Sequence, residues 1–156
     1  MDCDTAAMDV TAALDAPCAP EVLFGHVDEL TDYPRWMAMV HHVEQAEPTD
    51  GRPAWMVELR ARVGPLARSK RLRMVRSLHD PAAGHVRFER IETTRRTHSP
   101  WVLDAQVSAT TAGSRLEMHL HYGGSLWTAG VMERVLGDQI ESGRDRLLAL
   151  LTIDSA

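Results

Sequence analysis

The chain ends in the stretch SLWTAGVMERVLGDQIESGRDRLLALL, residues 125–151, which follows a turn at Gly123-Gly124 and is its only long helical pattern. Ser125 or Thr128 suits the helix N-cap, because a hydroxyl there accepts a hydrogen bond from a free backbone N–H. Apolar residues recur at near-helical spacing and give the helix one apolar side: Val131, Val135, Leu136, Ile140, Leu147, Leu148 and Leu151. We place most charged residues away from that side: Glu133, Asp138, Glu141, Arg144, Asp145 and Arg146.

Gly137 and Gly143 are weak points of this helix, since glycine costs about 1 kcal/mol relative to alanine in a helix interior. A glycine near the apolar side lets the helix approach its neighbour closely or leaves space for a ligand. Alternatively, the helix simply tolerates glycine at these two positions.

The segments before the helix predict strands. Five of them alternate apolar and polar residues with a period of two: 54–63, 69–78, 85–93, 101–109 and 115–122. Segments 8–14 and 40–47 add two further strands, with short helices at 20–27 and 28–33 and a turn at 48–53. Parallel strands need a crossover after each strand, which this order lacks. We therefore predict an α+β fold, a curved antiparallel sheet of about seven strands with the long helix over its concave face, which favours an enclosed hollow.

The overall composition fits one soluble domain. The 156 residues are 44% hydrophobic and 25% charged, and the net charge of −5 argues against nucleic acid as a partner. Cys3 and Cys18 show no metal-ligand spacing, which favours reduced thiols in a cytoplasmic protein. No apolar run reaches the roughly 20 residues that span a bilayer, so we expect no stable membrane insertion. We expect a single domain over 8–151, flanked by a short N-terminal segment 1–7 and a tail 152–156, as a monomer or homodimer.

Element order and local motifs together resemble the START-like helix-grip (SRPBCC) superfamily, and within it the polyketide cyclase/dehydrase and lipid-transport family. The motifs, spread over about residues 8–151, are Asp32-Tyr-Pro-Arg-Trp36, Val43-Glu44, Trp101-x-Leu103, Tyr122-Gly-Gly and Gly143-Arg-x-x-Leu147. The resemblance implies a cavity between sheet and long helix that holds a hydrophobic small molecule. It does not select one chemistry, because the superfamily includes lipid carriers, hormone receptors, aromatase/cyclases and oxygenase subunits.

The predicted ligand-binding residues are those in the inward phase of the strands and on the apolar side of the helix, with the tryptophans as aromatic walls. They are Trp36, Trp55, Val57, Leu59, Leu72, Met74, Arg76, Phe88, Arg90, Trp101, Leu103, Met118, Tyr122, Trp127, Val131 and Val135. Plain core packing is the alternative for any single tryptophan.

The polar inward positions are Arg76, Arg90 followed by Glu92, and Tyr122. Either arginine could receive a carboxylate or phenolate of an apolar ligand, with Tyr122 donating a hydrogen bond. Alternatively these arginines reach water from strand ends, or Arg90 pairs with Glu92 or another acid. Arg90, Tyr122 and His98 are the candidates for catalysis, and none of them forms a recognisable catalytic constellation.

The histidines give no metal site. His119 and His121 face outward from one strand, His41 and His42 diverge, and no third ligand joins either pair. We expect no metal and no cofactor. The basic run over residues 60–76 lies mostly on the solvent face without exposed aromatics, which again argues against nucleic acid.

These observations lead to three hypotheses of different classes. The leading one is binding or transport of a hydrophobic small molecule, such as a lipid, quinone or polyketide-like compound. The second is a polyketide cyclase/dehydratase-type enzyme that polarises a carbonyl or moves a proton. The third is a partner-binding regulatory protein of the toxin/antitoxin kind, acting through its outer sheet face.

Overall fold

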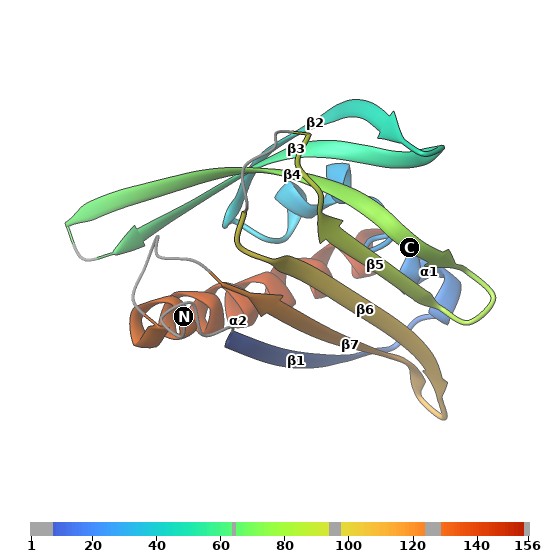
Figure 1. The fold of residues 1–156 in the computed structure, drawn as a ribbon. Helices are drawn as coiled ribbons and strands as arrows, with labels where there is room; N and C mark the ends of the chain where they lie inside the picture. The colour runs from blue at the N-terminus through green and yellow to red at the C-terminus, as the bar shows by residue number, and fades with distance from the viewer. Residues whose placement is uncertain (1–7, 64, 94–97, 124–128, 155–156) are drawn as a thin grey trace.

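The protein is an antiparallel sheet curved over one long helix (Figure 1). The computed structural model describes residues 8–63, 65–93, 98–123 and 129–154. In chain order the elements are β1 (Met8–Ala16), α1 (Pro20–Phe24), η1 (Leu30–Arg35), β2 (Val40–Thr49), β3 (Arg52–Val63), β4 (Leu66–Asp80), β5 (His85–Arg90), β6 (Trp101–Thr110), β7 (Gly113–Tyr122) and α2 (Ala129–Asp154). The seven strands are ordered β1-β7-β6-β5-β4-β3-β2. The predicted α+β helix-grip architecture is confirmed.

Strand register follows the alternation of the sequence. In β1 and β7, Leu14 lies opposite Leu116 and Ala12 opposite Met118, so apolar residues of the first and last strands share one face. The turn between β2 and β3 is the pair Asp50-Gly51, with φ of 52° and 77°. A two-residue turn whose central residues both have positive φ matches the right-handed twist of the flanking strands. Asp-Gly is favoured in such a turn because both residues tolerate positive φ.

Several boundaries differ from the sequence prediction. α1 ends at Phe24 rather than residue 27, and the second short helix is the 3₁₀ helix η1, Leu30–Arg35, rather than 28–33. Pro34 lies inside η1, and a proline cannot donate the backbone hydrogen bond that an α-helix requires. β5 ends at Arg90, three residues early, whereas α2 continues to Asp154. The predicted start of the long helix at residues 125–128 lies outside the described residues.

An aromatic cluster forms the core between η1 and the sheet. The Tyr33 ring lies 4.9 Å from Trp36 and 6.1 Å from Phe88, centroid to centroid, and Phe88 lies 5.7 Å from Trp55. The Tyr33 hydroxyl donates to the Val27 carbonyl at 2.8 Å, and Trp36 Nε1 donates to the His26 carbonyl at 3.2 Å. The motif Asp32–Trp36 therefore fixes the short helices against the sheet, and both of its aromatic side chains are buried with their polar atoms satisfied.

Helix α2 crosses the concave face diagonally (Figure 1). Among the described residues, its close backbone approaches to the sheet are to β1 and β3, which lie toward opposite sides of the strand order. A Cβ added at Gly143 would lie 2.8 Å from the Trp36 carbonyl oxygen. Gly143 therefore serves the close-approach role considered above, although α2 approaches the end of η1 there rather than the sheet. No helix among the described residues is long and apolar enough to cross a membrane.

Candidate functional site

Part of the concave face is apolar but only half-buried. We call this surface the β7 strip: Val10, Ala12, Leu103, Met118 and Leu120. Strand pairing makes it continuous, since Leu120 lies between Val10 and Leu103 across the sheet, and Ala12 lies opposite Met118. Leu14 and Leu116, which share the inward phase, are buried. Inward-facing apolar groups that the protein does not itself cover are the surface that a hydrophobic guest would cover.

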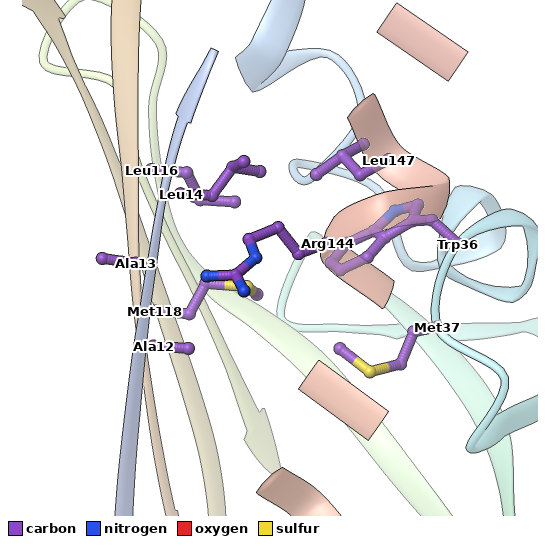
Figure 2. A pocket seen from close by; sticks show the side chains of 9 residues that line it. All are labelled: Ala12, Ala13, Leu14, Trp36, Met37, Leu116, Met118, Arg144 and Leu147. Atoms are coloured by element: carbon purple, nitrogen blue, oxygen red, sulfur yellow. The ribbon is translucent and has the colours of Figure 1, made fainter. Parts of the chain in front are cut away.

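A small pocket opens at one end of this strip, between β1, β7 and α2 (Figure 2). It is lined by Ala12, Ala13, Leu14, Trp36, Met37, Leu116, Met118, Arg144 and Leu147. Its volume is about 30 Å³, room for about two water molecules, since one water needs at least 10–15 Å³. The alanines of β1 leave this space open because they have no side-chain atoms beyond Cβ.

Arg144 points into this pocket. Figure 2 shows its side chain extending from α2 toward β1, with the guanidinium beside Met118. Arg144 therefore borders an apolar pocket although its side chain is exposed, as expected for the charged residues of this helix. Arg144 follows Ile140 by four residues and precedes Leu147 by three, so helical geometry places it on the same face as the apolar residues.

Two aromatic residues meet at the other end of the strip. The Trp101 and Tyr122 rings lie 5.5 Å apart at an angle of 39°, and both side chains are about 5% exposed. The Trp101 indole N–H is buried without a hydrogen-bond acceptor among the described residues. A buried donor normally has a partner. The structure thus brings together two predicted ligand-binding residues, one of which has an unused donor.

Arg90 is held by the protein's own groups. Its Nε donates to Glu92 Oε2 at 2.7 Å, and Nη1 donates to the Ser99 carbonyl at 3.2 Å. Nη2 lies 3.3 Å from His98 Nδ1, which accepts because a guanidinium has no lone pair to offer. The ion pair with Glu92 is the alternative that the sequence analysis left open, and the ligand-anchor role of Arg90 stays a prediction.

The groups around Glu92 stabilise its charged form beside Arg90. Burial raises the pKa of the Glu92 carboxyl, but hydrogen bonds from Arg90 and from the Arg73 backbone N–H outweigh it. The net pKa of Glu92 is lower than its ordinary value. Arg90 and Glu92 therefore form a charged pair that ties the end of β5 to β4.

Arg76 is also engaged, at the opposite side of the sheet from β1. Its Nη1 donates to the Asp28 carbonyl at 2.8 Å, and its guanidinium carbon lies 5.8 Å from the Trp55 ring centroid. Arg76 thus connects β4 to the segment between α1 and η1. Its role as a ligand anchor stays a prediction.

The outward histidines bind acids of neighbouring strands. His119 Nε2 lies 2.7 Å and His121 Nδ1 lies 3.0 Å from Asp9 Oδ1. Both hydrogen bonds lower the pKa of Asp9, and the one with His121 has the larger effect. His85 Nε2 similarly lies 2.8 Å from Asp104 Oδ1. Within the described ranges, no group of three or more His, Cys, Asp or Glu residues is placed to hold a metal ion. These contacts join β1 to β7 and β5 to β6 on the outer face.

The remaining predicted lining residues lie in three places. Leu103 and Met118 belong to the β7 strip, and Trp36 forms one wall of the pocket. Buried in the core are Trp55, Val57, Leu59, Leu72, Met74 and Phe88. Trp127 lies outside the described residues, and the side chains of Val131 and Val135 are not described. A ligand contact at these positions stays a prediction.

Pocket residues missed by the sequence analysis include Ala12, Met37 and Arg144. Ala12 could have been predicted, because it lies two residues from Leu14 on a strand and so faces the same side. Arg144 could have been predicted, because it lies three residues before Leu147 on a helix. Met37 follows the Asp32–Trp36 motif without any periodic signal of its own.

Comparisons with known proteins give the family. A family model described as polyketide cyclase/dehydrase and lipid transport matches residues 7–152. A search of curated proteins finds no match. The Zhui aromatase/cyclase from Streptomyces sp. R1128 is similar in structure, with a TM-score of 0.70, 12% identity and 97% of each chain covered. A START superfamily protein from Mycobacterium smegmatis has a TM-score of 0.63 and 12% identity, over 94% of this chain and 97% of that one. Such likeness shows the fold alone, while the family match identifies the chain as a member of the polyketide cyclase/dehydrase and lipid-transport family.

Proposed function

We propose that the protein binds and carries a hydrophobic small molecule, such as a lipid, quinone or polyketide-like compound, against the concave face of its sheet. The supporting observation is the β7 strip, which lies on the face crossed by α2 yet stays only half-buried. Each square ångström of apolar surface removed from water contributes about 25 cal/mol, so a guest that covers these side chains gains affinity directly.

The size of the pocket shapes this proposal. Pockets that enclose a small molecule have volumes of at least about 300 Å³. The pocket between β1, β7 and α2 is about 30 Å³, so it does not enclose such a guest. We therefore propose a guest that lies along the β7 strip as a chain or a flat ring system, rather than one that fills a preformed chamber.

Binding of Nile red, an uncharged apolar dye, tests this function. We expect Leu120→Gln to weaken dye binding about tenfold or more, because a polar amide would replace apolar surface at the centre of the strip. Glu117→Gln is the matched control, since Glu117 is exposed on the outward phase of the same strand. Native mass spectrometry of the purified protein adds a direct search for a bound guest. Equal dye affinity of the two variants would contradict the proposal.

Catalysis of the aromatase/cyclase kind is a second candidate function. The unused indole donor of Trp101, beside Tyr122, supports it, because such a donor can stabilise an oxyanion during ring closure. The test is turnover of a synthetic poly-β-ketone thioester. An enzyme should lose at least tenfold in turnover on Trp101→Phe, whereas a carrier should release the compound chemically unchanged.

A further inference from the structure

Arg144 is exposed and borders the pocket from α2, and it differs from three arginines of the sheet that donate to the protein's own groups. Arg73, Arg76 and Arg90 each donate to an acceptor of the protein: the Ile91 carbonyl, the Asp28 carbonyl and the Glu92 carboxylate. Arg144 makes no hydrogen bond or ion pair with any residue that the structure describes. A guanidinium bears five N–H donors and a fixed charge, so among the described residues this one leaves its donors to water or to a ligand.

The surroundings of Arg144 supply no counter-charge. Apart from Arg144 itself, the side chains that line the pocket are hydrophobic, and Figure 2 shows the guanidinium among Leu14, Leu116 and Met118. The carboxylates nearest in the helix sequence, Glu141 and Asp145, form no ion pair with it. The pocket therefore combines one positive charge with apolar walls, which is the environment suited to an anionic group attached to an apolar body.

The pocket and the β7 strip are continuous. Met118 and Ala12 belong to both, and Leu120 follows Met118 in the inward phase of β7. From Leu116 to Tyr122 the strand runs about 20 Å at about 3.4 Å per residue, which is enough for a medium-length alkyl chain. The pocket at about 30 Å³ has room for a small headgroup only, so the body of a ligand bound there must continue along the strip.

We propose that Arg144 receives the carboxylate of an amphipathic guest whose apolar body lies along the β7 strip. This inference rests on the proposed function and narrows it to fatty-acid-like or aromatic carboxylic acids. The guanidinium offers a two-pronged contact to the carboxylate oxygens, and the apolar walls beside this exposed arginine receive the body of the guest. The small volume favours a planar carboxylate over the bulkier phosphate.

The test compares three probes with the same twelve-carbon chain: dodecanoate, dodecanol and dodecyl phosphate, each titrated by displacement of Nile red. The wild-type protein should bind dodecanoate at least tenfold more tightly than dodecanol. Arg144→Ala should lose that preference, about tenfold in dodecanoate affinity, with dodecanol affinity unchanged. Arg146→Ala is the matched control, because Arg146 is an exposed arginine on the same helix that does not line the pocket.

The outcomes separate this inference from the proposed function. If Nile red and all three probes fail to bind, the proposed function is wrong and the inference with it. If the probes bind but Arg144→Ala keeps the preference for dodecanoate, or matches Arg146→Ala, the carboxylate site is wrong while the carrier function stands. Tighter binding of dodecyl phosphate than of dodecanoate overturns the carboxylate assignment. Arg144→Lys gives an internal check, since a charge without the planar fork should retain part of the preference.

Discussion

The two halves of the concave face are built from similar residues but are buried to different extents. On β3, β4 and β5 the inward residues Trp55, Leu72 and Phe88 are almost completely buried. On β6 and β7 the inward residues Leu103, Met118 and Leu120 are half-buried, while the inward residues around them, such as Ala105 and Leu116, are buried. Tyr33 and Trp36 pack toward Phe88 and cover the middle of the first group, whereas α1 approaches other parts of β6 and β7. Helix α2 approaches the sheet at both β1 and β3, so the half-buried β7 strip lies between its two contacts with the sheet.

The largest expected effect compares truncations in the two halves. Phe88→Ala should destabilise the protein by about 3–5 kcal/mol, since it removes a fully buried ring from a packed cluster. Leu120→Ala should cost much less, about 1 kcal/mol, because that side chain is already partly in water. Urea unfolding followed by tryptophan fluorescence measures both. Equal costs would mean that the β7 half is packed as tightly as the β5 half.

The next effect concerns the charged pair at the end of the filled half. The folded-state pKa of Glu92 lies below its ordinary value, so its contribution to stability is fully present above that ordinary value and is lost as the pH falls through the folded-state pKa. Glu92→Gln should destabilise the protein by about 2 kcal/mol at neutral pH, because Arg90 loses its charged acceptor in a mostly buried site.

Urea unfolding at a series of pH values from neutral to acidic checks this prediction. The stability of the wild type and of Glu92→Gln should converge as the pH falls, because both then lack a charge at this position. A constant difference between them at every pH would show that Glu92 acts through packing alone. Glu44→Gln is the control, an exposed glutamate on β2 whose partner His42 is also exposed.

A smaller effect tests whether a buried and a half-buried position of the same row tolerate added volume differently. Ala12, Met118 and Ala105 lie in one row across β1, β7 and β6, but Ala105 is completely buried whereas Ala12 is half-buried at the pocket. Ala105→Leu should cost about 1–3 kcal/mol through overpacking, and Ala12→Leu less than about 1 kcal/mol. The ligand effect should be reversed, with Ala12→Leu alone weakening dodecanoate binding. Thermal unfolding and the Nile red assay measure the two effects.

Much of this contrast between halves could not be predicted from the sequence. Period-two alternation predicted the strands and the inward phase of residues such as Leu103 and Met118, because alternation reports which face is apolar. It does not report what covers that face. Trp36 and Trp55 were predicted as ligand contacts with core packing as the alternative, and the structure buries both, with Trp36 also bordering the pocket. Tyr33 contacts Trp36 and Phe88, and Phe88 contacts Trp55, which joins three segments distant in the sequence. Such packing depends on tertiary contacts that no local pattern encodes.

The roles of the polar residues were also only partly predictable from the sequence. The inward phase of Arg90 was apparent from the strand pattern, and Glu92 was considered as its partner, but the choice between ion pair and ligand anchor required coordinates. Arg144 was predictable from helical spacing alone, and was missed because its charge suggested solvent. Long cationic side chains lie over apolar surface while keeping their charge near water, so charge is a poor guide to their face.

The smallest expected effect tests the contact that positions α2 on the filled half. Gly→Ala in a helix interior usually stabilises by about 1 kcal/mol. At Gly143 the new methyl group would lie 2.8 Å from the Trp36 carbonyl oxygen, a backbone atom that cannot move alone. We therefore expect Gly143→Ala to destabilise by about 1 kcal/mol net, a decrease in Tm of about 2–4 °C. Ser142→Ala, one residue earlier on the same helix, should be neutral or stabilising. A stabilised Gly143→Ala variant would show that α2 can move off η1 at no cost, and the contrast between a filled and an open half would then depend on the sheet alone.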